Sequence, residues 1–370
     1  MKRIFINGLS SSRGGAKSIL NNLLKRLPNK YVFFVLTPNY NEYKEYNNNN
    51  YISIVDINSI YQKNIIAPIV YKYVLPKIIK KYNIDVVLNL ATLPIALQDK
   101  YIKQIYLFDW PYAIYPKSPV WNKLSYKNFL IRKLKVCFLK YFIKYPDIVI
   151  AQTQTSKKRL HKIYGLNNIQ IVPNGVSIQK DNEYKNFNFP KGIKLLYLTV
   201  YYPHKNLDIF IPLAKKIKEM GLEVKLIITI PNNDKNAFAF LNAIKQENLE
   251  DIIINIGRVH SKHIKSLYEQ CDGLLMPTCL ESFSGAYLEA MYYKKPIITS
   301  DKDFSREICK DIAYYIDPNN VDNILNKIIN IFINKTNQNE IKRKIKEGFD
   351  LSITQYNWDD VIDKYMLLIK

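Results

Sequence analysis

The chain has 370 residues, of which 48% are hydrophobic, and it carries a formal net charge of +22 at pH 7. This length and apolar content are enough for two domains that each bury a core. The cysteines lack the spacing of a metal site or a disulfide framework, no run of 18 apolar residues is present, and the basic start lacks the apolar core of a signal peptide. We therefore expect a reduced, cytosolic protein without a membrane-spanning helix; its cysteines are Cys137, Cys271, Cys279 and Cys309.

Strand and helix patterns alternate through the first half of the chain. The expected strands are residues 3–6, 31–36, 52–55, 85–90, 104–108, 148–151 and 169–172, and the expected helices are 16–27, 68–81 and 155–164. This order predicts an α/β domain in which helices cover both faces of a parallel sheet.

A glycine-rich turn follows the first expected strand. Gly14 and Gly15 permit a close approach of the backbone to a ligand, and the next helix offers its positive end. Ala16 separates Gly15 from Lys17, so this is not a Walker loop. The turn either helps to hold an acceptor or the phosphates of a donor, or it is a flexible connection without a ligand. In the same way, Asp109 at the end of the fifth expected strand either faces a cleft or caps a turn.

The positive charge is concentrated in the first half. Residues 1–175 contain 27 Lys and Arg against 7 Asp and Glu, a formal +20, whereas residues 176–370 amount to +2. Nucleic acid, anionic lipid and a phosphorylated acceptor would all be attracted to such a field. Within it, residues 123–144 carry seven basic side chains among aromatic ones and no acid. This segment is a surface helix whose apolar residues belong to the core, or a partly buried helix whose basic edge contacts an anionic membrane surface; we favour the second, and no nucleic-acid motif is present.

A linker and a second series of strands and helices follow. Residues 172–176 form a turn, 177–192 are polar and irregular, and the second series begins at Ile193. There, an apolar strand runs into the loop that contains Lys205, before a helix that ends near Met220. The Lys205 ammonium could offset the charge of a phosphate, or Lys205 is an ordinary surface lysine.

The segment from Glu281 to Glu289 places two carboxylates eight residues apart around the expected start of a helix near Ser284. An apolar strand at 273–276 precedes it and another at 297–298 follows it. The free N–H groups at the helix start would bind a diphosphate without a metal. Glu281 would then accept hydrogen bonds from sugar hydroxyls and Glu289 from ribose hydroxyls. The alternative is that Glu281 caps the helix and Glu289 is exposed.

These motifs resemble, in type and order, those of the retaining nucleotide-sugar glycosyltransferases of family 4, also called glycosyltransferase group 1, which have the GT-B fold. The segment from Glu281 to Glu289 is similar to their E-x7-E motif, and Lys205 stands where members carry a diphosphate-binding lysine. The resemblance implies a strand, a loop and a strand over 300–318. Helical patterns follow at 321–333, 340–350 and 358–369, and the resemblance implies that the last helix returns to the first domain.

The resemblance also implies a site. Glu281 and Lys205 would be catalytic, and the donor would be bound by Arg258, Ser282, Phe283, Ser284, Gly285 and Glu289. Gly14, Gly15 and Asp109 would serve the acceptor or line the cleft. The chain departs from the family at Val200, where members often carry an arginine, and at Ser282 and Ser284, where many have glycine. Arg258 is our candidate substitute for the missing arginine, and these departures leave the donor's identity open.

We therefore expect a GT-B protein with two Rossmann-like domains facing across a cleft. The expected divisions are an acceptor-binding domain at 1–176, the linker at 177–192, a donor-binding domain at 193–354 and a returning helix at 355–370. The expected activity is metal-independent transfer of a hexose, with retention, from a nucleoside diphosphate sugar to a glycan or lipid-linked glycan. By resemblance the setting is bacterial lipopolysaccharide or capsule synthesis at the inner face of the cell membrane, without nucleic acid. A nucleotide-sugar 2-epimerase of the same fold and a non-enzymatic basic binding module are the alternatives.

Overall fold

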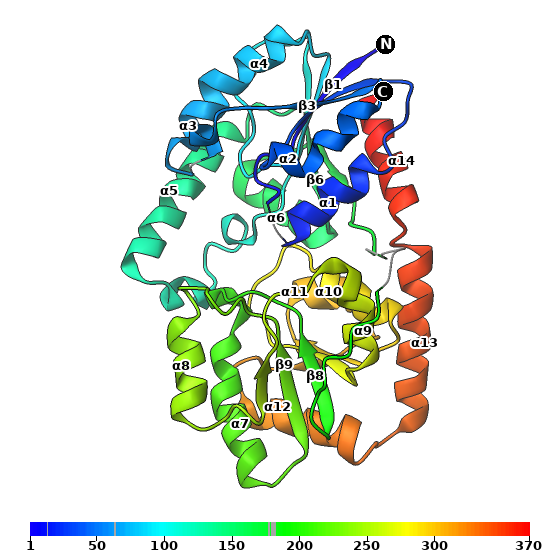
Figure 1. The fold of residues 1–370 in the computed structure, drawn as a ribbon. Helices are drawn as coiled ribbons and strands as arrows, with labels where there is room; N and C mark the ends of the chain where they lie inside the picture. The colour runs from blue at the N-terminus through cyan, green and yellow to red at the C-terminus, as the bar shows by residue number, and fades with distance from the viewer. Residues whose placement is uncertain (13, 63, 177, 179–182) are drawn as a thin grey trace. The chain divides into compact units, whose positions relative to one another are not determined.

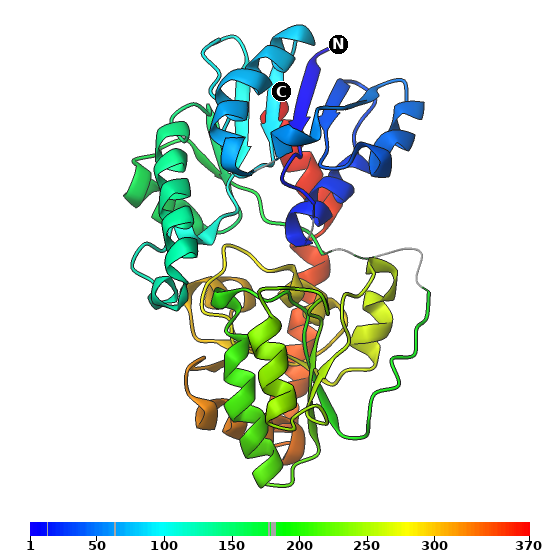
Figure 2. The same cartoon turned by 60° about the vertical axis from the view of Figure 1, so that its left-hand side comes forward.

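The structure, a computed structural model, describes residues 1–12, 14–62, 64–176, 178 and 183–370. Most of the first part of the expected linker at 177–192 thus lies outside the described residues. The chain forms two compact units (Figure 1 and Figure 2). Unit 1 comprises Met1–Lys117, Leu124–Asn174 and Trp358–Lys370, and unit 2 comprises Ser118–Lys123 and Gly175–Asn357. The short segment Ser118–Lys123 therefore belongs to unit 2, although the sequence placed it in the first domain.

Unit 1 contains a parallel sheet of seven strands in the order β3-β2-β1-β4-β5-β6-β7. Each strand reads as a short apolar run, as expected for strands covered on both faces. Their bounds are β1 Arg3–Asn7, β2 Val32–Leu36, β3 Ile52–Val55, β4 Val86–Asn89, β5 Lys103–Leu107, β6 Ile148–Ala151 and β7 Ile169–Ile171. All seven strands expected from the sequence are present, with ends that differ by at most one residue.

The helices of unit 1 are divided between the two faces of the sheet. One face packs on α1 and α14, which contribute Leu20 and Val361 among others, and the opposite face packs on α4, α5 and α6. In Figure 1 and Figure 2, α14, in red, lies beside the blue N-terminal elements of this unit. The bounds are α1 Gly14–Leu24, α2 Tyr40–Tyr43, α3 Ala67–Ile69, α4 Leu75–Lys81, α5 Tyr126–Phe142, α6 Gln154–Tyr164 and α14 Trp358–Ile369.

The single helix expected at 68–81 is divided into three pieces. Between α3 and α4 the segment Val70–Val74 has π-helical hydrogen bonding. Pro76 lies in the first turn of α4. Because proline lacks an N–H and its ring collides with the preceding turn, a regular α-helix cannot continue through it. The spacing of apolar residues thus predicted where the helical region lies but not where it is interrupted.

Unit 2 contains a parallel sheet of six strands in the order β10-β9-β8-β11-β12-β13. The bounds are β8 Ile193–Tyr197, β9 Val224–Ile228, β10 Ile253–Asn255, β11 Gly273–Met276, β12 Ile297–Ser300 and β13 Tyr314–Ile316. Two parallel-sheet, Rossmann-like units were the expected fold class, and this expectation is confirmed.

Helices cover the sheet of unit 2, with bounds α7 Phe210–Glu219, α8 Phe238–Gln246, α9 Ile264–Glu269, α10 Gly285–Tyr292, α11 Asp303–Cys309, α12 Val321–Ile328 and α13 Gln338–Thr354. The expectation of a loop between the strands of 300–318 was wrong, because α11 lies there. Phe304 and Ile308 are four residues apart and both are buried, so this short helix has the apolar side that fixes it to the core.

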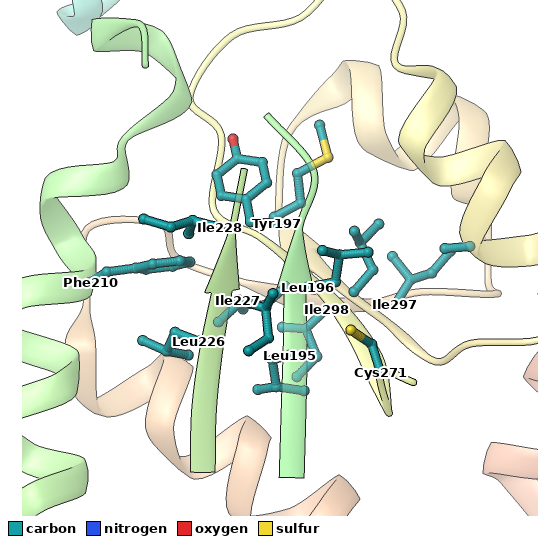
Figure 3. Packing of buried hydrophobic residues seen from close by; sticks show 14 of the residues in the cluster. Leu195, Leu196, Tyr197, Phe210, Leu226, Ile227, Ile228, Cys271, Ile297 and Ile298 are labelled. Atoms are coloured by element: carbon teal, nitrogen blue, oxygen red, sulfur yellow. The ribbon is translucent and has the colours of Figure 1, made fainter. Parts of the chain in front are cut away.

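A continuous hydrophobic core fills unit 2. Figure 3 shows the side chains of β8 and β9 at its centre, with Phe210 of α7 and Cys271 on opposite sides of the view. Tyr197, the last residue of β8, is fully buried and its ring lies 6.0 Å from that of Phe210. The core holds the carboxyl ends of β8 and β11 rigidly, and the loops that follow these two strands contain Lys205 and Glu281.

Candidate functional site

Lys205 and Glu281 form an ion pair in unit 2. Their Nζ and Oε1 atoms are in contact, and the two side chains are only 17% and 7% exposed. The hydroxyl of Thr278 also donates to Glu281 Oε1, at 3.1 Å. Residues 76 positions apart in the sequence are thus brought together, because β8 and β11 are neighbours and their loops leave the same edge of the sheet.

Backbone hydrogen bonds lock the two loops to each other. The N–H of Cys279 donates to His204 O at 2.8 Å, and the hydroxyl of Thr278, whose one hydrogen is shared with Glu281 Oε1, lies 3.1 Å from the same carbonyl. The hydroxyl of Tyr197, at the end of β8, donates to Lys205 O at 3.0 Å. The position of the ammonium is therefore set by a buried network, which favours a preorganised site over a mobile surface lysine.

Helix α10 begins beside this pair, with Ser284 as its N-cap residue. Ser284 has an extended backbone and its side chain makes no capping hydrogen bond; its hydroxyl instead faces Met276 Sδ at 3.9 Å. Gly285 is exposed, with open space around its Cα. A helix whose N-cap side chain makes no capping hydrogen bond can offer its first amide groups to an anion. Ser282 is buried in the preceding loop, and Phe283 packs on Tyr356 with ring centroids 6.2 Å apart.

Glu289 lies one turn inside α10 and is partly buried. The hydroxyl of Tyr268, on α9, donates to its Oε2 atom at 3.3 Å. Burial raises the pKa of the Glu289 carboxyl to about 7, although the Tyr268 hydrogen bond lowers it in part. Because Glu289 is half-buried and hydrogen-bonded to Tyr268, the alternative of an exposed helical glutamate does not hold.

Arg258 is the predicted donor-site residue that follows β10. It lies exposed in the loop after β10, and within the described residues it makes no ion pair. The strand order places β10 at the edge, two strands from β8. Val200, at the position of the family arginine, is half-buried in the loop after β8. Arg258 as the substitute for that arginine stays a prediction.

The predicted acceptor residues all lie in unit 1. Gly14 and Gly15 are the first two residues of α1, which begins two residues earlier than expected; both are exposed, and Gly14 has a φ of 60°. Asp109 follows β5 and is partly buried. Burial raises the pKa of its carboxyl to about 6, opposed by the nearby Lys135 ammonium.

Sequence reasoning did not single out Lys135, Tyr268 or Thr278. Lys135 comes from α5 and lies over the Trp110 ring at 4.5 Å, next to Asp109, and burial lowers the pKa of its ammonium to about 8. Its only sequence signal was membership of the basic segment 123–144. Tyr268 and Thr278 carried no signal, because their roles depend on hydrogen bonds to other segments: to α10 for Tyr268 and to the loop after β8 for Thr278.

Among the described residues, no group of three or more His, Cys, Asp or Glu side chains is placed to hold a metal ion. In the same part of the chain, every helix is too short or too polar to cross a bilayer.

The comparisons with known proteins cover nearly the whole chain. The family model described as glycosyl transferases group 1 matches residues 179–348, and the model of glycosyltransferase family 4 matches residues 13–180. The match begins in unit 1 and extends through α10 and most of α13, so it includes Lys205, Glu281 and Glu289.

Individual relatives are more distant. An uncharacterized glycosyltransferase of Methanocaldococcus jannaschii is 26% identical over 64% of this chain and 60% of its own length. The O-antigen chain mannosyltransferase RfbU of Salmonella typhimurium is 28% identical over 52% of this chain and 53% of its own length. The alignments thus span little more than half of these two relatives. The structure of Anabaena HepE in complex with UDP-glucose is similar in fold, with a TM-score of 0.73 over 100% of this chain and 99% of that chain at 13% identity.

Proposed function

Because the chain belongs to the group 1 glycosyltransferases of family 4, with the GT-B fold, we propose that it transfers a hexose from a nucleoside diphosphate sugar to a hydroxyl of a glycan or lipid-linked glycan, with retention and without a metal. The observation that carries this proposal is the buried Lys205–Glu281 ion pair beside the uncapped start of α10. It offers a cation, a carboxylate and free amide groups within one loop cluster.

Each part of this cluster suits one part of such a donor. The amide groups at Ser284 and Gly285 and the ammonium of Lys205 would bind the diphosphate. Glu281 would accept hydrogen bonds from the sugar, and Glu289 from the ribose. Lys205 is paired with Glu281, so the donor's phosphate would compete for a cation that is already in position.

In the proposed reaction the bond between the anomeric carbon and the diphosphate oxygen breaks, and a bond from the acceptor oxygen to the same carbon forms. Negative charge grows on the departing diphosphate, where Lys205 and the dipole of α10 would stabilise it. The acceptor's proton would pass to that diphosphate on the same face of the sugar, so no separate base is required. Glu281 and Glu289 would not act as a hydrolase pair, because they would contact different parts of the donor.

We place the acceptor in unit 1, at Gly14, Gly15 and Asp109, and add an anionic membrane surface as partner. The outer side of α5 supports the second assignment. Tyr126, Leu130 and Leu134 are spaced by four residues, so they share one side of the helix, and they are 78%, 47% and 56% exposed. The exposed lysines Lys127, Lys133 and Lys140 lie on the same helix. Apolar rings and chains beside ammonium groups suit the headgroup region of an anionic bilayer.

This arrangement refines the expectation for residues 123–144. Only Leu139 and Phe142 of α5 are buried, so the apolar residues lie on two sides of the helix: one in the core and one exposed with the lysines. A lipid-linked acceptor and a role in surface polysaccharide or lipopolysaccharide synthesis fit this face, and the Salmonella relative is named for O-antigen chain synthesis.

The test is thermal stabilisation by UDP-, GDP-, ADP- and dTDP-sugars, with and without EDTA, for the wild type and Glu289→Ala. We expect one nucleotide class to stabilise the wild type regardless of EDTA and to lose this effect in the variant. Stabilisation that EDTA abolishes would contradict metal independence. No response to any sugar nucleotide would contradict the donor site and favour a binding module, and conversion of the donor without an acceptor would indicate a 2-epimerase.

A further inference from the structure

The turn Pro119–Lys123 is a separate piece of unit 2, supplied by the first half of the chain. It is anchored by Val120 and Trp121, which are only 1% and 5% exposed. The N–H of Trp121 donates to Ser118 O at 3.1 Å, which closes the turn. Burial of these two apolar side chains holds the turn in place and so fixes the backbone position of Lys123, its last residue.

Lys123 contacts the residue that follows Lys205. Its Nζ atom donates to Asn206 Oδ1 at 2.6 Å, across 83 positions of sequence. The amide nitrogen of the Asn206 side chain donates to Pro318 O at 2.7 Å, in the segment after β13. Asn206 is 4% exposed, so both ends of its side-chain amide are used in a buried setting. One side chain thus joins three segments of unit 2.

The backbone of Asn206 gives this contact a consequence for Lys205. Asn206 has a φ of 57°, in the left-handed region that non-glycine residues adopt rarely and asparagine more readily than most. The loop reverses there, directly after Lys205. Because the two side-chain hydrogen bonds fix Asn206, they also fix the direction in which the preceding residue leaves the backbone. Without the hydrogen bond from Lys123, the buried side-chain oxygen of Asn206 would be left without its donor.

Lys123 is also close to the loop of Glu281. Its positive charge acts on the thiol of Cys279, where burial raises the pKa and Lys123 opposes that rise. Cys279 in turn donates its N–H to His204 O at 2.8 Å. The turn therefore adjoins both loops that build the ion pair.

We propose that Lys123 is a positioning residue of the donor site, which holds Asn206 and thereby the loop that aims Lys205 at Glu281. The inference rests on the proposed function, in which Lys205 stabilises the departing diphosphate. A segment from the first half of the chain would then determine the geometry of the donor site in the second half.

Kinetics with the most stabilising sugar nucleotide of the panel test this role, following release of the nucleoside diphosphate. We expect Lys123→Met to lower kcat about tenfold, because a small displacement of a charge-stabilising group is costly, and to change KM for the donor less than about threefold. Lys123→Arg keeps a cationic donor and should recover kcat to within about twofold of the wild type. Lys117→Met, which removes an exposed charge nearby, is the matched control and should be unaffected.

A double-mutant cycle separates positioning from a direct contact with the donor. Asn206→Gly preserves the left-handed backbone and removes the side chain. If Lys123 acts through Asn206, adding Lys123→Met to this variant should lower kcat no further. Independent, multiplicative losses would instead identify Lys123 as a phosphate ligand and overturn the proposal.

Amide hydrogen exchange of the ligand-free protein makes the inference testable apart from the activity. We expect peptides covering residues 203–209 to exchange about tenfold faster in Lys123→Met, and at the wild-type rate in Lys117→Met. Unchanged exchange in Lys123→Met would overturn the proposal, and so would faster exchange with an unchanged kcat. If no sugar nucleotide stabilises the protein, the proposed function fails, while the exchange result still decides whether Lys123 holds the loop.

Discussion

Units 1 and 2 share a parallel-sheet plan but use the carboxyl ends of their strands differently. In unit 2, a cation and a carboxylate are paired and nearly buried beside the start of α10. In unit 1, Asp109 and Lys135 lie near the end of β5, while an apolar and basic side of α5 is exposed. The compact, preorganised site suits a small donor, whereas the exposed side suits an extended partner. Donor chemistry and attachment to a surface should therefore be separable by mutation.

The largest expected effect is on catalysis in unit 2. Lys205→Ala and Glu281→Ala should each lower kcat about 10²–10³-fold, because each removes a preorganised charged group from the departing diphosphate or the sugar. The measurement is transfer rate at saturating donor. Lys216→Ala is the matched control, since it breaks an exposed ion pair with Asp322 in the same unit. Wild-type rates in either site variant would refute the site assignment.

The second-largest expected effect is on vesicle binding, and it should depend on unit 1 alone. Replacing Leu130 and Leu134 together by serine removes apolar area from the exposed side of α5 and should weaken binding to phosphatidylglycerol-containing vesicles about tenfold or more. Flotation or co-sedimentation measures this. Donor-induced thermal stabilisation should be unchanged in the same variant. A protein that binds vesicles as tightly as the wild type would exclude α5 as the contact.

Donor affinity should depend on pH through Glu289. Its pKa is raised to about 7 in the folded chain, so below that pH the carboxyl is increasingly protonated and cannot accept two hydrogen bonds. Affinity should thus be highest above pH 7 and fall about tenfold between pH 8 and pH 6, as the ionised fraction falls. Titration of the donor at a series of pH values measures this, and Glu289→Gln should bind weakly with a flat profile.

The same raised pKa makes a prediction about stability of opposite sign. A carboxyl whose pKa rises on folding binds its proton more tightly in the folded chain than in the unfolded chain. Its contribution to stability is therefore complete below pH 4.5, the ordinary pKa of a glutamate, and is lost as the pH rises to about 7. Ligand-free Glu289→Gln should therefore melt about 2–4 °C above the wild type at pH 8. A lower melting temperature would mean that the Tyr268 hydrogen bond outweighs burial.

The smallest effect should be at Asp109. Asp109→Asn keeps the size of the side chain and one acceptor oxygen and removes a charge beside Lys135, so we expect a loss of only a few-fold in transfer rate, confined to the acceptor's KM. Steady-state kinetics with the acceptor varied measures this. A large fall in kcat at fixed donor would instead give Asp109 a part in the chemical step.

The sequence determined the architecture and the chemical types. Short apolar runs alternating with helical periods predicted parallel sheets, and all seven strands of unit 1 were predicted from them, because strands covered on both faces are rich in apolar residues. The segment from Glu281 to Glu289 located the start of α10 to within one residue, and the charge difference between the halves needed only counting. The loop expected in place of α11 failed because seven residues hold too few periods to show a pattern.

Only the tertiary structure decided which of these residues meet. Lys205 and Glu281 are 76 positions apart and Lys123 and Asn206 are 83 apart, and no local pattern records either contact. No local pattern records the partial burial of Glu289 either, or its hydrogen bond with Tyr268 from another helix. Local sequence determines helices and strands through short-range sterics and periodicity. Contacts between distant residues, their burial and their pKa values depend instead on the spatial order of the strands in each sheet, which is decided only when the whole core packs.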